Sequence, residues 1–226
     1  MAFYNYEMPY NSPRLSFRYF VAVLALALPA ALIASKTFVK PVAKAATNYP
    51  AHDFHRDEKV AIAADPYDNA EKAKIFTINF AQHGFLPIFF IVTNDGDQPV
   101  SIANIHITLT TAHDSKLTPI ETDDLYRRLS NPQAKTDTNN PLPFPHKVKG
   151  GVTEKEKDEI ETSQFAARAV EPHTTQSGFL FFDIADLNSP LRGANIDITG
   201  VTDAKGNELM FFEIPMDKYF HAPKNP

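Results

Sequence analysis

The longest apolar pattern of the chain spans residues 85–111 and predicts the centre of the fold. Residues 85–92 are apolar at both alternating sets of positions, which is typical of a strand buried on both faces. A polar turn containing an Asp-Gly pair follows at 94–97, and a second apolar segment, 100–111, ends in alternating threonines. We therefore predict a β-hairpin whose first strand lies centrally in a sheet.

A change of parity interrupts the second arm of this hairpin. Val100 and Ile102 share one alternating set of positions, whereas the apolar residues from Ile105 onward share the other. A slip of one residue would expose half of these side chains to water. We therefore predict a β-bulge near residues 103 and 104.

Further segments of the same kind predict an antiparallel all-β fold. Short alternating stretches are separated by turn residues. Two more polar stretches carry helix-capping signals, a threonine cap at Thr118 or Thr122 and a capping box of Thr153 and Glu156, and the proline-rich residues 130–149 between them predict a loop. The predicted strands are 60–64, 75–80, 166–170, 178–184, 195–201 and 209–216, the last two joined as a hairpin; the predicted helices run from Thr118 or Thr122 to Leu129 and over 154–165. Seven or eight short strands with two short inserted helices predict a β-sandwich.

Three groups of residues resemble a known class of proteins. They are Asn94, Gly96 and Pro99 in the predicted hairpin, Pro172 followed by the segment 177–183, and Gly206 before the last aromatic strand. With these residues, the region 60–216 resembles uncharacterised exported bacterial proteins that carry an immunoglobulin-like β-sandwich. The resemblance implies that fold and an extracytoplasmic setting, periplasmic or secreted, and it carries over no site residues.

The amino-terminal residues predict export. Two arginines precede an uncharged apolar run, which is the arrangement of a signal peptide. The run is short for a spanning helix, but the best cleavage site, at 43–45, lies far from it, so an uncleaved membrane anchor at 19–39 is the alternative. The expected parts are a signal peptide or anchor at 1–45, a polar tether at 46–58, and a β-sandwich domain at 59–226 with a helical insertion at 112–165.

Charge and composition narrow the expected partners. Five of the 22 Lys and Arg residues and one of the 27 Asp and Glu residues lie in 1–45, which leaves 17 basic and 26 acidic residues and a net charge of −9. So acidic a domain is not expected to bind nucleic acid or an anionic membrane surface, and we expect membrane contact only through an uncleaved amino-terminal segment. The absence of cysteine excludes disulfides, thiolate metal ligands and a cysteine nucleophile.

Candidate reactive side chains gather in the insertion. They are His113, Asp114, Asp124, Arg127 and His146. If at least two of them converged in a deep pocket, they would form a site for a small molecule or a metal in an enzyme. The histidines and aspartate of 52–55 are capable of ligating a metal, and the Asx residues of 94–97 are capable of ligating calcium. A polar tether and a turn explain these two groups more simply.

The sequence thus predicts a non-enzymatic exported module without catalytic residues, metal or cofactor. No nucleophile elbow and no phosphate loop is present in the sequence. We expect a protein-interaction or accessory subunit of the cell envelope, with another envelope protein as its partner. The alternative is a small-molecule or metal-binding enzyme whose site lies in 111–165.

Overall fold

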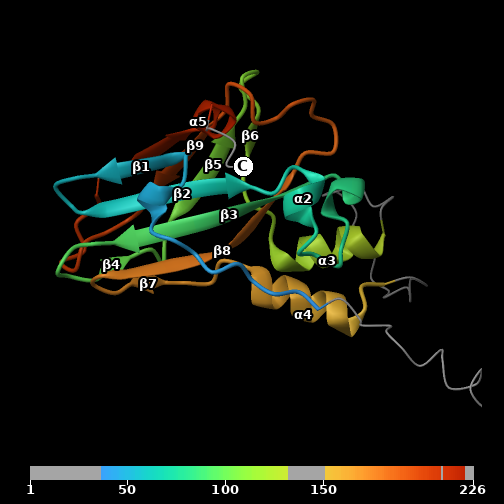
Figure 1. The fold of residues 1–226 in the computed structure, drawn as a ribbon, viewed down its shortest axis with the longest axis horizontal. Helices are drawn as coiled ribbons and strands as arrows, with labels where there is room; N and C mark the ends of the chain where they lie inside the picture. The colour runs from blue at the N-terminus through green and yellow to red at the C-terminus, as the bar shows by residue number, and fades with distance from the viewer. Residues whose placement is uncertain (1–36, 132–150, 210, 222–226) are drawn as a thin grey trace, which may run out of the picture. The chain divides into compact units, whose positions relative to one another are not determined.

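Strand β3 (Phe85–Asn94) lies inside the first of two four-stranded antiparallel sheets (Figure 1). The computed structural model describes residues 37–131, 151–209 and 211–221, and they belong to one compact unit that begins at Thr37. The first sheet has the strand order β1 (His52–His55), β2 (Val60–Pro66), β3, β8 (Thr174–Asp183). All 10 residues of β3 are buried, which confirms the prediction of a central strand.

The second sheet contains the carboxyl-terminal strands. Its order is β10 (Phe212–Pro215), β9 (Asn195–Thr199), β5 (His106–Thr110), β6 (Lys116–Leu117). β9 and β10 form the predicted hairpin, and the Asp203 carboxylate orders their connection by accepting backbone N–H groups. A small sheet pairs β4 (Val100–Ser101) with β7 (Ala169–Val170). The described fold is therefore mostly β, with antiparallel sheets and few helices.

One hydrophobic core contains side chains of both four-stranded sheets. Alternate residues of β2 and β3, such as Ile62, Ile88 and Phe90, belong to the same buried cluster as Ile196 and Phe212 of the second sheet. The period of two along each strand sends these residues to one face. The two sheets therefore bury a common apolar layer.

A second core covers the opposite face of the first sheet. Phe89, Phe179 and Phe181 of that sheet pack with Phe76 and with apolar residues of the helices. Those helices are η1 (Ala46–Asn48), η2 (Phe80–His83), α3 (Thr122–Ser130) and α4 (Glu154–Ser163). The other described helices are the short α2 (Ala70–Ala73) and α5 (Asp217–Phe220). The apolar character of β3 on both faces follows from these two cores.

The predicted hairpin over 85–111 is wrong in its pairing. β3 pairs with β2 and β8, whereas the second segment pairs with β7, β9 and β6. The second arm is not one continuous strand, because residues 102–105 separate β4 from β5. The change of parity therefore reflects two strands in different sheets, and the predicted bulge is wrong. Val100, Ile102, Ile107 and Leu109 all reach the first core in this way.

The segment 75–80 also differs from the prediction. It is not a strand, yet Phe76, Ile78 and Phe80 are buried while Thr77 and Asn79 are more exposed, as the alternation indicated. The Thr77 and Ile78 N–H groups donate to the Glu159 carboxylate of α4 instead of a neighbouring strand, and the Ile75 and Phe76 N–H groups donate to carbonyl oxygens of residues 72 and 73. The alternating pattern therefore predicted which side chains are buried, but it did not predict which acceptors the backbone N–H groups use.

The two inserted helices are confirmed, but only one of them begins with the predicted side-chain cap. α4 begins with the predicted capping box of Thr153 and Glu156, and it ends two residues before the expected Phe165, at Ser163. α3 begins at Thr122 behind Glu121, without a side-chain cap, so the predicted threonine cap is wrong. The loop expected at 130–149 lies almost entirely outside the described residues.

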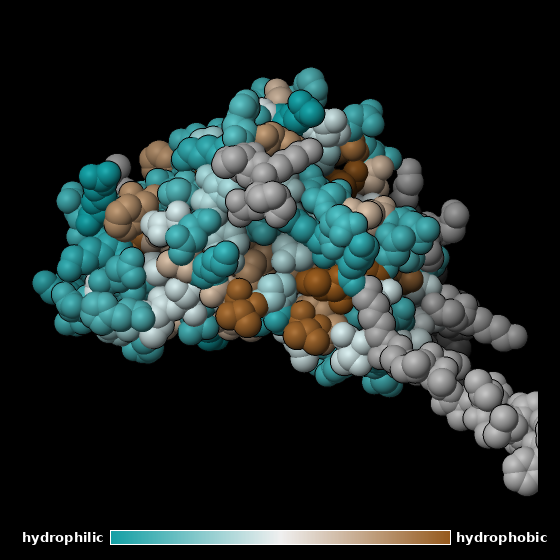
Figure 2. Space-filling model, viewed as in Figure 1, coloured by the Kyte–Doolittle hydropathy of each residue, from teal (hydrophilic) through white to brown (hydrophobic). Residues whose placement is uncertain are grey.

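An amino-terminal strap, defined as residues 37–49, packs on the second core. The Phe38 ring stacks on Phe76 with 5.4 Å between centroids, and the Ala46 N–H donates to Thr93 Oγ1 at 2.8 Å. Figure 2 shows a hydrophobic patch in the region that the strap crosses in Figure 1. The boundary expected after residue 45 falls inside this strap.

The tether predicted at 46–58 is an ordered part of the fold, because it contains η1 and the edge strand β1. The Asp53 carboxylate of β1 accepts the Glu213 N–H of β10, which joins edge strands of the two sheets. Among the described residues no helix is long and apolar enough to cross a membrane. Most of the predicted signal or anchor segment lies outside those residues.

Candidate functional site

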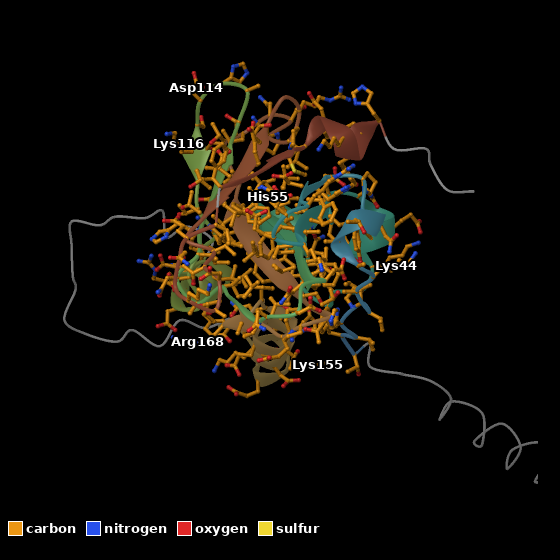
Figure 3. The ribbon with its side chains drawn as sticks, turned by 90° about the vertical axis from the view of Figure 1, so that its left-hand side faces the viewer. Lys44, His55, Asp114, Lys116, Lys155 and Arg168 are labelled. Carbon is orange, nitrogen blue, oxygen red and sulfur yellow. The ribbon has the colours of Figure 1, made fainter. Side chains whose placement is uncertain are left out.

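The residues that the sequence singled out in the insertion occupy different elements. His113 and Asp114 lie in the exposed loop after β5, where Thr111 Oγ1 accepts the His113 N–H at 3.3 Å. Asp124 and Arg127 pair with each other on α3, at 2.7 Å. Figure 3 shows Asp114 at one end of the molecule and Lys155 of α4 at the other. His146 lies outside the described residues.

The His52–His55 group, weighed as a metal site, makes structural contacts instead. The His55 ring stacks on Phe212 with centroids 3.8 Å apart, and its Nε2 lies 3.4 Å from Asp53 Oδ2. His52 Nδ1 lies 2.6 Å from the Tyr49 carbonyl oxygen. No group of three or more potential metal ligands occurs in the described part of the chain.

The Asx residues of the β3–β4 turn likewise hold the backbone. Asn94 is fully buried, and its amide donates to the carbonyl oxygens of Gln98 and Val170. Its side-chain oxygen accepts the Gly96 N–H at 2.9 Å. These are the bonds of an Asx turn, and they engage the Asn94 oxygen that would have ligated calcium.

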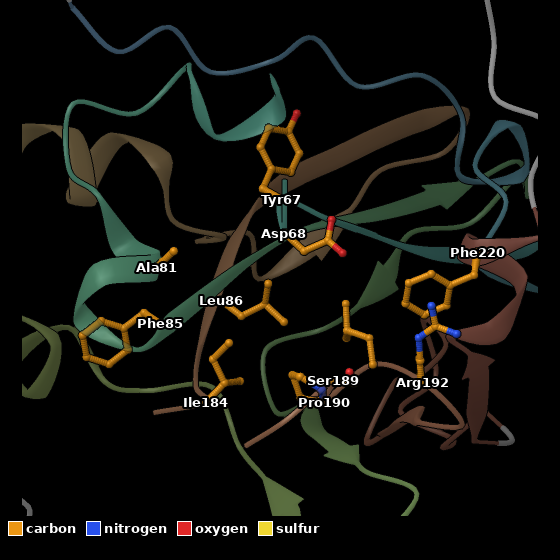
Figure 4. Close-up of a pocket in the computed structure, with 11 residues that line it drawn as sticks. Tyr67, Asp68, Ala81, Phe85, Leu86, Ile184, Ser189, Pro190, Arg192 and Phe220 are labelled. Carbon is orange, nitrogen blue, oxygen red and sulfur yellow. The ribbon is translucent and has the colours of Figure 1, made fainter. Parts of the chain in front are cut away.

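A pocket of about 280 Å³ lies where the end of β2, the start of β3, the β8–β9 loop and α5 meet (Figure 4). We call it the end pocket. It is lined by Tyr67, Asp68, Ala81, Phe85, Leu86, Ile184, Ser189, Pro190, Leu191, Arg192 and Phe220. Phe85, Leu86 and Leu191 are buried, so the floor is apolar. Asp68 and Arg192 bring opposite charges to its rim.

A glycine sets the approach of the β8–β9 loop to the pocket. Gly84 has φ +75°, and a Cβ placed on it would lie 2.7 Å from the Cβ of Ala185. The Ile184 N–H donates to the Gly84 carbonyl oxygen at 2.8 Å, and this bond is possible because the two backbones come so close. The sequence Gly84–Leu86 and the loop after Ile184 thus form adjoining walls.

A charged cluster beside the pocket fixes α2 and α5. The Lys72 ammonium donates to Asp65 Oδ1 at 2.5 Å and to the Pro66 carbonyl oxygen at 3.0 Å. It also lies 4.6 Å from the ring centroid of Tyr219. Burial raises the pKa of Asp65, although the hydrogen bond from Lys72 opposes that shift. Lys72 is therefore committed to holding α2 and α5 on the end of β2.

Asp68 is held in one orientation by α5. The Tyr219 hydroxyl donates to Asp68 Oδ1 at 2.8 Å, and the Asn69 amide lies 3.5 Å from the same oxygen. Burial raises the pKa of the Tyr219 phenol, and the hydrogen bond to Asp68 raises it further, so the phenol keeps its proton at neutral pH. Figure 4 shows the Asp68 carboxylate turned toward the side of the pocket where Arg192 and Phe220 lie.

Arg192 supplies the positive charge at the rim. Its guanidinium carbon lies over the Phe220 ring, 5.3 Å from the centroid, and the residue is exposed to solvent. Among the described residues no carboxylate lies within ion-pair distance of it. An Arg fork in this state is suited to binding a carboxylate through two hydrogen bonds.

The end pocket was not found from the sequence, because its parts are far apart along the chain. Asp68, the 184–192 loop and Phe220 belong to separate segments, and none carries a motif. The turn signal at 65–68 and the Pro-Leu-Arg run at 190–192 are ordinary loop composition. Only their joint packing on β3 makes a site.

Comparison of the chain with protein-family models gives no match, and comparison with curated protein sequences gives none either.

Proposed function

We propose that this chain is a non-enzymatic, exported binding module of the cell envelope, built as an immunoglobulin-like β-sandwich. It acts as an accessory subunit of another envelope protein, and the end pocket is its recognition site. The amino-terminal apolar run supports export, and the resemblance over 60–216 supports the envelope setting.

The observation that carries the proposal is the end pocket itself. Its floor is apolar and buried, and its rim bears one carboxylate and one guanidinium that are not paired with each other. A concave apolar surface with a few placed polar groups is the usual form of a recognition site. The surrounding charges, such as Lys72 and Asp65, bond to each other and thereby hold the walls.

Site-specific photocrosslinking in native envelopes tests this proposal. A photoreactive residue replaces Ala81, which is exposed and lines the pocket; the matched control replaces Ala204, which is exposed in the β9–β10 connection. We expect a crosslinked product of defined mass from position 81, reduced by Arg192→Glu, and none of that mass from position 204. Equal products from both positions, or none from position 81, would reject the proposal.

A further inference from the structure

We infer that the end pocket binds an amino-acid-like zwitterion with an apolar side chain, either a free amino acid or a short peptide. This inference rests on the proposed function only in taking the end pocket as the recognition site. It adds the chemical class of the ligand, which follows from the size of the pocket, the nature of its floor and the two charges of its rim.

The size and floor of the pocket select a small apolar group. Its 280 Å³ lies near the lower limit of ligand pockets, roughly 300–1,000 Å³, so the pocket suits a ligand of amino-acid or dipeptide size. Phe85, Leu86 and Ile184 present carbon atoms to this space (Figure 4). The buried Leu191 also lines it. A leucine or phenylalanine side chain would gain from leaving water there, and glycine would not.

The negative side of the rim selects a cation. Asp68 Oδ1 is already bonded to the Tyr219 hydroxyl, while Oδ2 has no protein donor within the described residues. Lys72, the nearby ammonium, is bound to Asp65. An ammonium group on the ligand would therefore find an oriented carboxylate acceptor without displacing a protein cation.

The positive side of the rim selects a carboxylate on the same ligand. Arg192 lies over the Phe220 ring and is exposed, with no carboxylate of the described residues in ion-pair range. A purely anionic ligand would meet repulsion from Asp68, and a purely cationic one would meet repulsion from Arg192. A zwitterion satisfies both groups, so the rim discriminates by charge and the floor by side chain.

Calorimetric titration of the purified full chain tests the inference with defined probes. The zwitterions are L-leucine, L-phenylalanine and Leu-Leu, where the dipeptide separates its two charges further and so distinguishes a free amino acid from a peptide. N-acetyl-leucine lacks the cation, leucinamide lacks the carboxylate, and glycine lacks the side chain. We expect at least one zwitterion to bind at least tenfold more tightly than each of the three controls.

Two variants assign each charge to its partner. Asp68→Asn should weaken binding of leucine but not that of N-acetyl-leucine, which loses the repulsion from Asp68 and should bind as well or better. Arg192→Gln should weaken leucine but not leucinamide, which loses the repulsion from Arg192. Arg168→Gln, an exposed arginine outside the pocket (Figure 3), should change nothing. Arg192 is exposed, so its variant remains informative even if Asp68→Asn disturbs α5.

The outcomes separate this inference from the proposed function. If no zwitterion binds below 10 mM, on the order of the weakest affinity worth assigning, or if the controls bind equally well, the ligand class is wrong. A crosslink from position 81 would in that case leave the proposed function standing. If a zwitterion binds with the expected variant pattern and no crosslink forms, the ligand class stands and the envelope partner is rejected.

Discussion

Replacing Glu159 tests how the helical layer is fastened to the first sheet. Glu159 is a buried carboxylate of α4, and it accepts the Thr77 N–H at 2.9 Å and the Ile78 N–H at 3.2 Å. It also accepts a hydrogen bond from the Thr77 hydroxyl. The segment 75–80 has no strand partner, so this side chain takes the place of a neighbouring strand.

The expected cost follows from the donors left without an acceptor. Glu159→Ala would leave two backbone N–H groups without an acceptor. Each buried unsatisfied donor costs about 1–3 kcal/mol, so we expect the free energy of unfolding to fall by about 3–4 kcal/mol. Glu159→Gln keeps one acceptor oxygen but loses the charge-assisted bonds, and we expect a loss of about 1–2 kcal/mol. We therefore expect Glu159→Ala to lower the free energy of unfolding more than Glu159→Gln does.

Equilibrium urea unfolding measures these differences, with hydrogen exchange at Thr77 and Ile78 as a local readout. Asp158→Ala is the matched control, since Asp158 is exposed on the same helix and should change stability by less than about 0.5 kcal/mol. If Glu159→Ala costs less than about 1 kcal/mol, or if Gln is as damaging as Ala, the carboxylate does not cap the 75–80 backbone and the reasoning fails.

Three further predictions follow from the sheets. Phe90→Ala should cost about 3–5 kcal/mol in a urea titration, because Phe90 is fully buried in the first core; a loss under about 1 kcal/mol would contradict that placement. Gly178→Ala should destabilise by about 1–3 kcal/mol, since its Cβ would lie 2.4 Å from the Phe165 Cα, whereas Gly151→Ala, with only a side-chain oxygen at 3.8 Å, should be neutral in the same assay. Burial would raise the pKa of Asp183, but hydrogen bonds from the Arg128 guanidinium and the Ala185 N–H, together with the charge of Arg128, outweigh burial and lower that pKa. The stabilisation is therefore present above about pH 4 and is lost as the pH falls through the lowered value. The pair is partly exposed, so the loss should be at most about 1 kcal/mol, and thermal unfolding of Asp183→Asn should lack this acid-dependent part; an unchanged pH profile would refute the assignment.

The features that the sequence predicted well are those determined by neighbouring residues. The burial of β3 on both faces, the capping box at Thr153 and the β9–β10 hairpin each depend on a few consecutive side chains. Local backbone preference and periodicity carry that information directly. The partner of a strand is different, because it depends on packing between segments that are distant along the chain.

The wrong hairpin illustrates this limit. The Asp-Gly turn after Asn94 does reverse the chain, and the Asn94 amide organises it. The return segment nevertheless pairs with β7 and β9, because β3 is already flanked by β2 and β8 and its apolar residues are needed in both cores. A turn signal thus fixes the direction of the chain, and the competition among strands decides which sheet receives it.

Several side chains in the described part of the insertion stabilise the fold, so this part is less suited to ligand recognition than the end pocket. Leu125 and Ile160 fill the second core, Glu159 caps the 75–80 backbone, and Arg128 pairs with Asp183 of β8. Side chains committed to such bonds are not available to a ligand without loss of stability. A site in 111–165 would therefore depend on residues such as His113. The end pocket, in contrast, presents a carboxylate oxygen and a guanidinium without a charged partner among the described residues, above an apolar floor. Recognition at the end pocket would leave the two cores undisturbed, which is the arrangement expected when packed antiparallel sheets carry a function at the loops of one end.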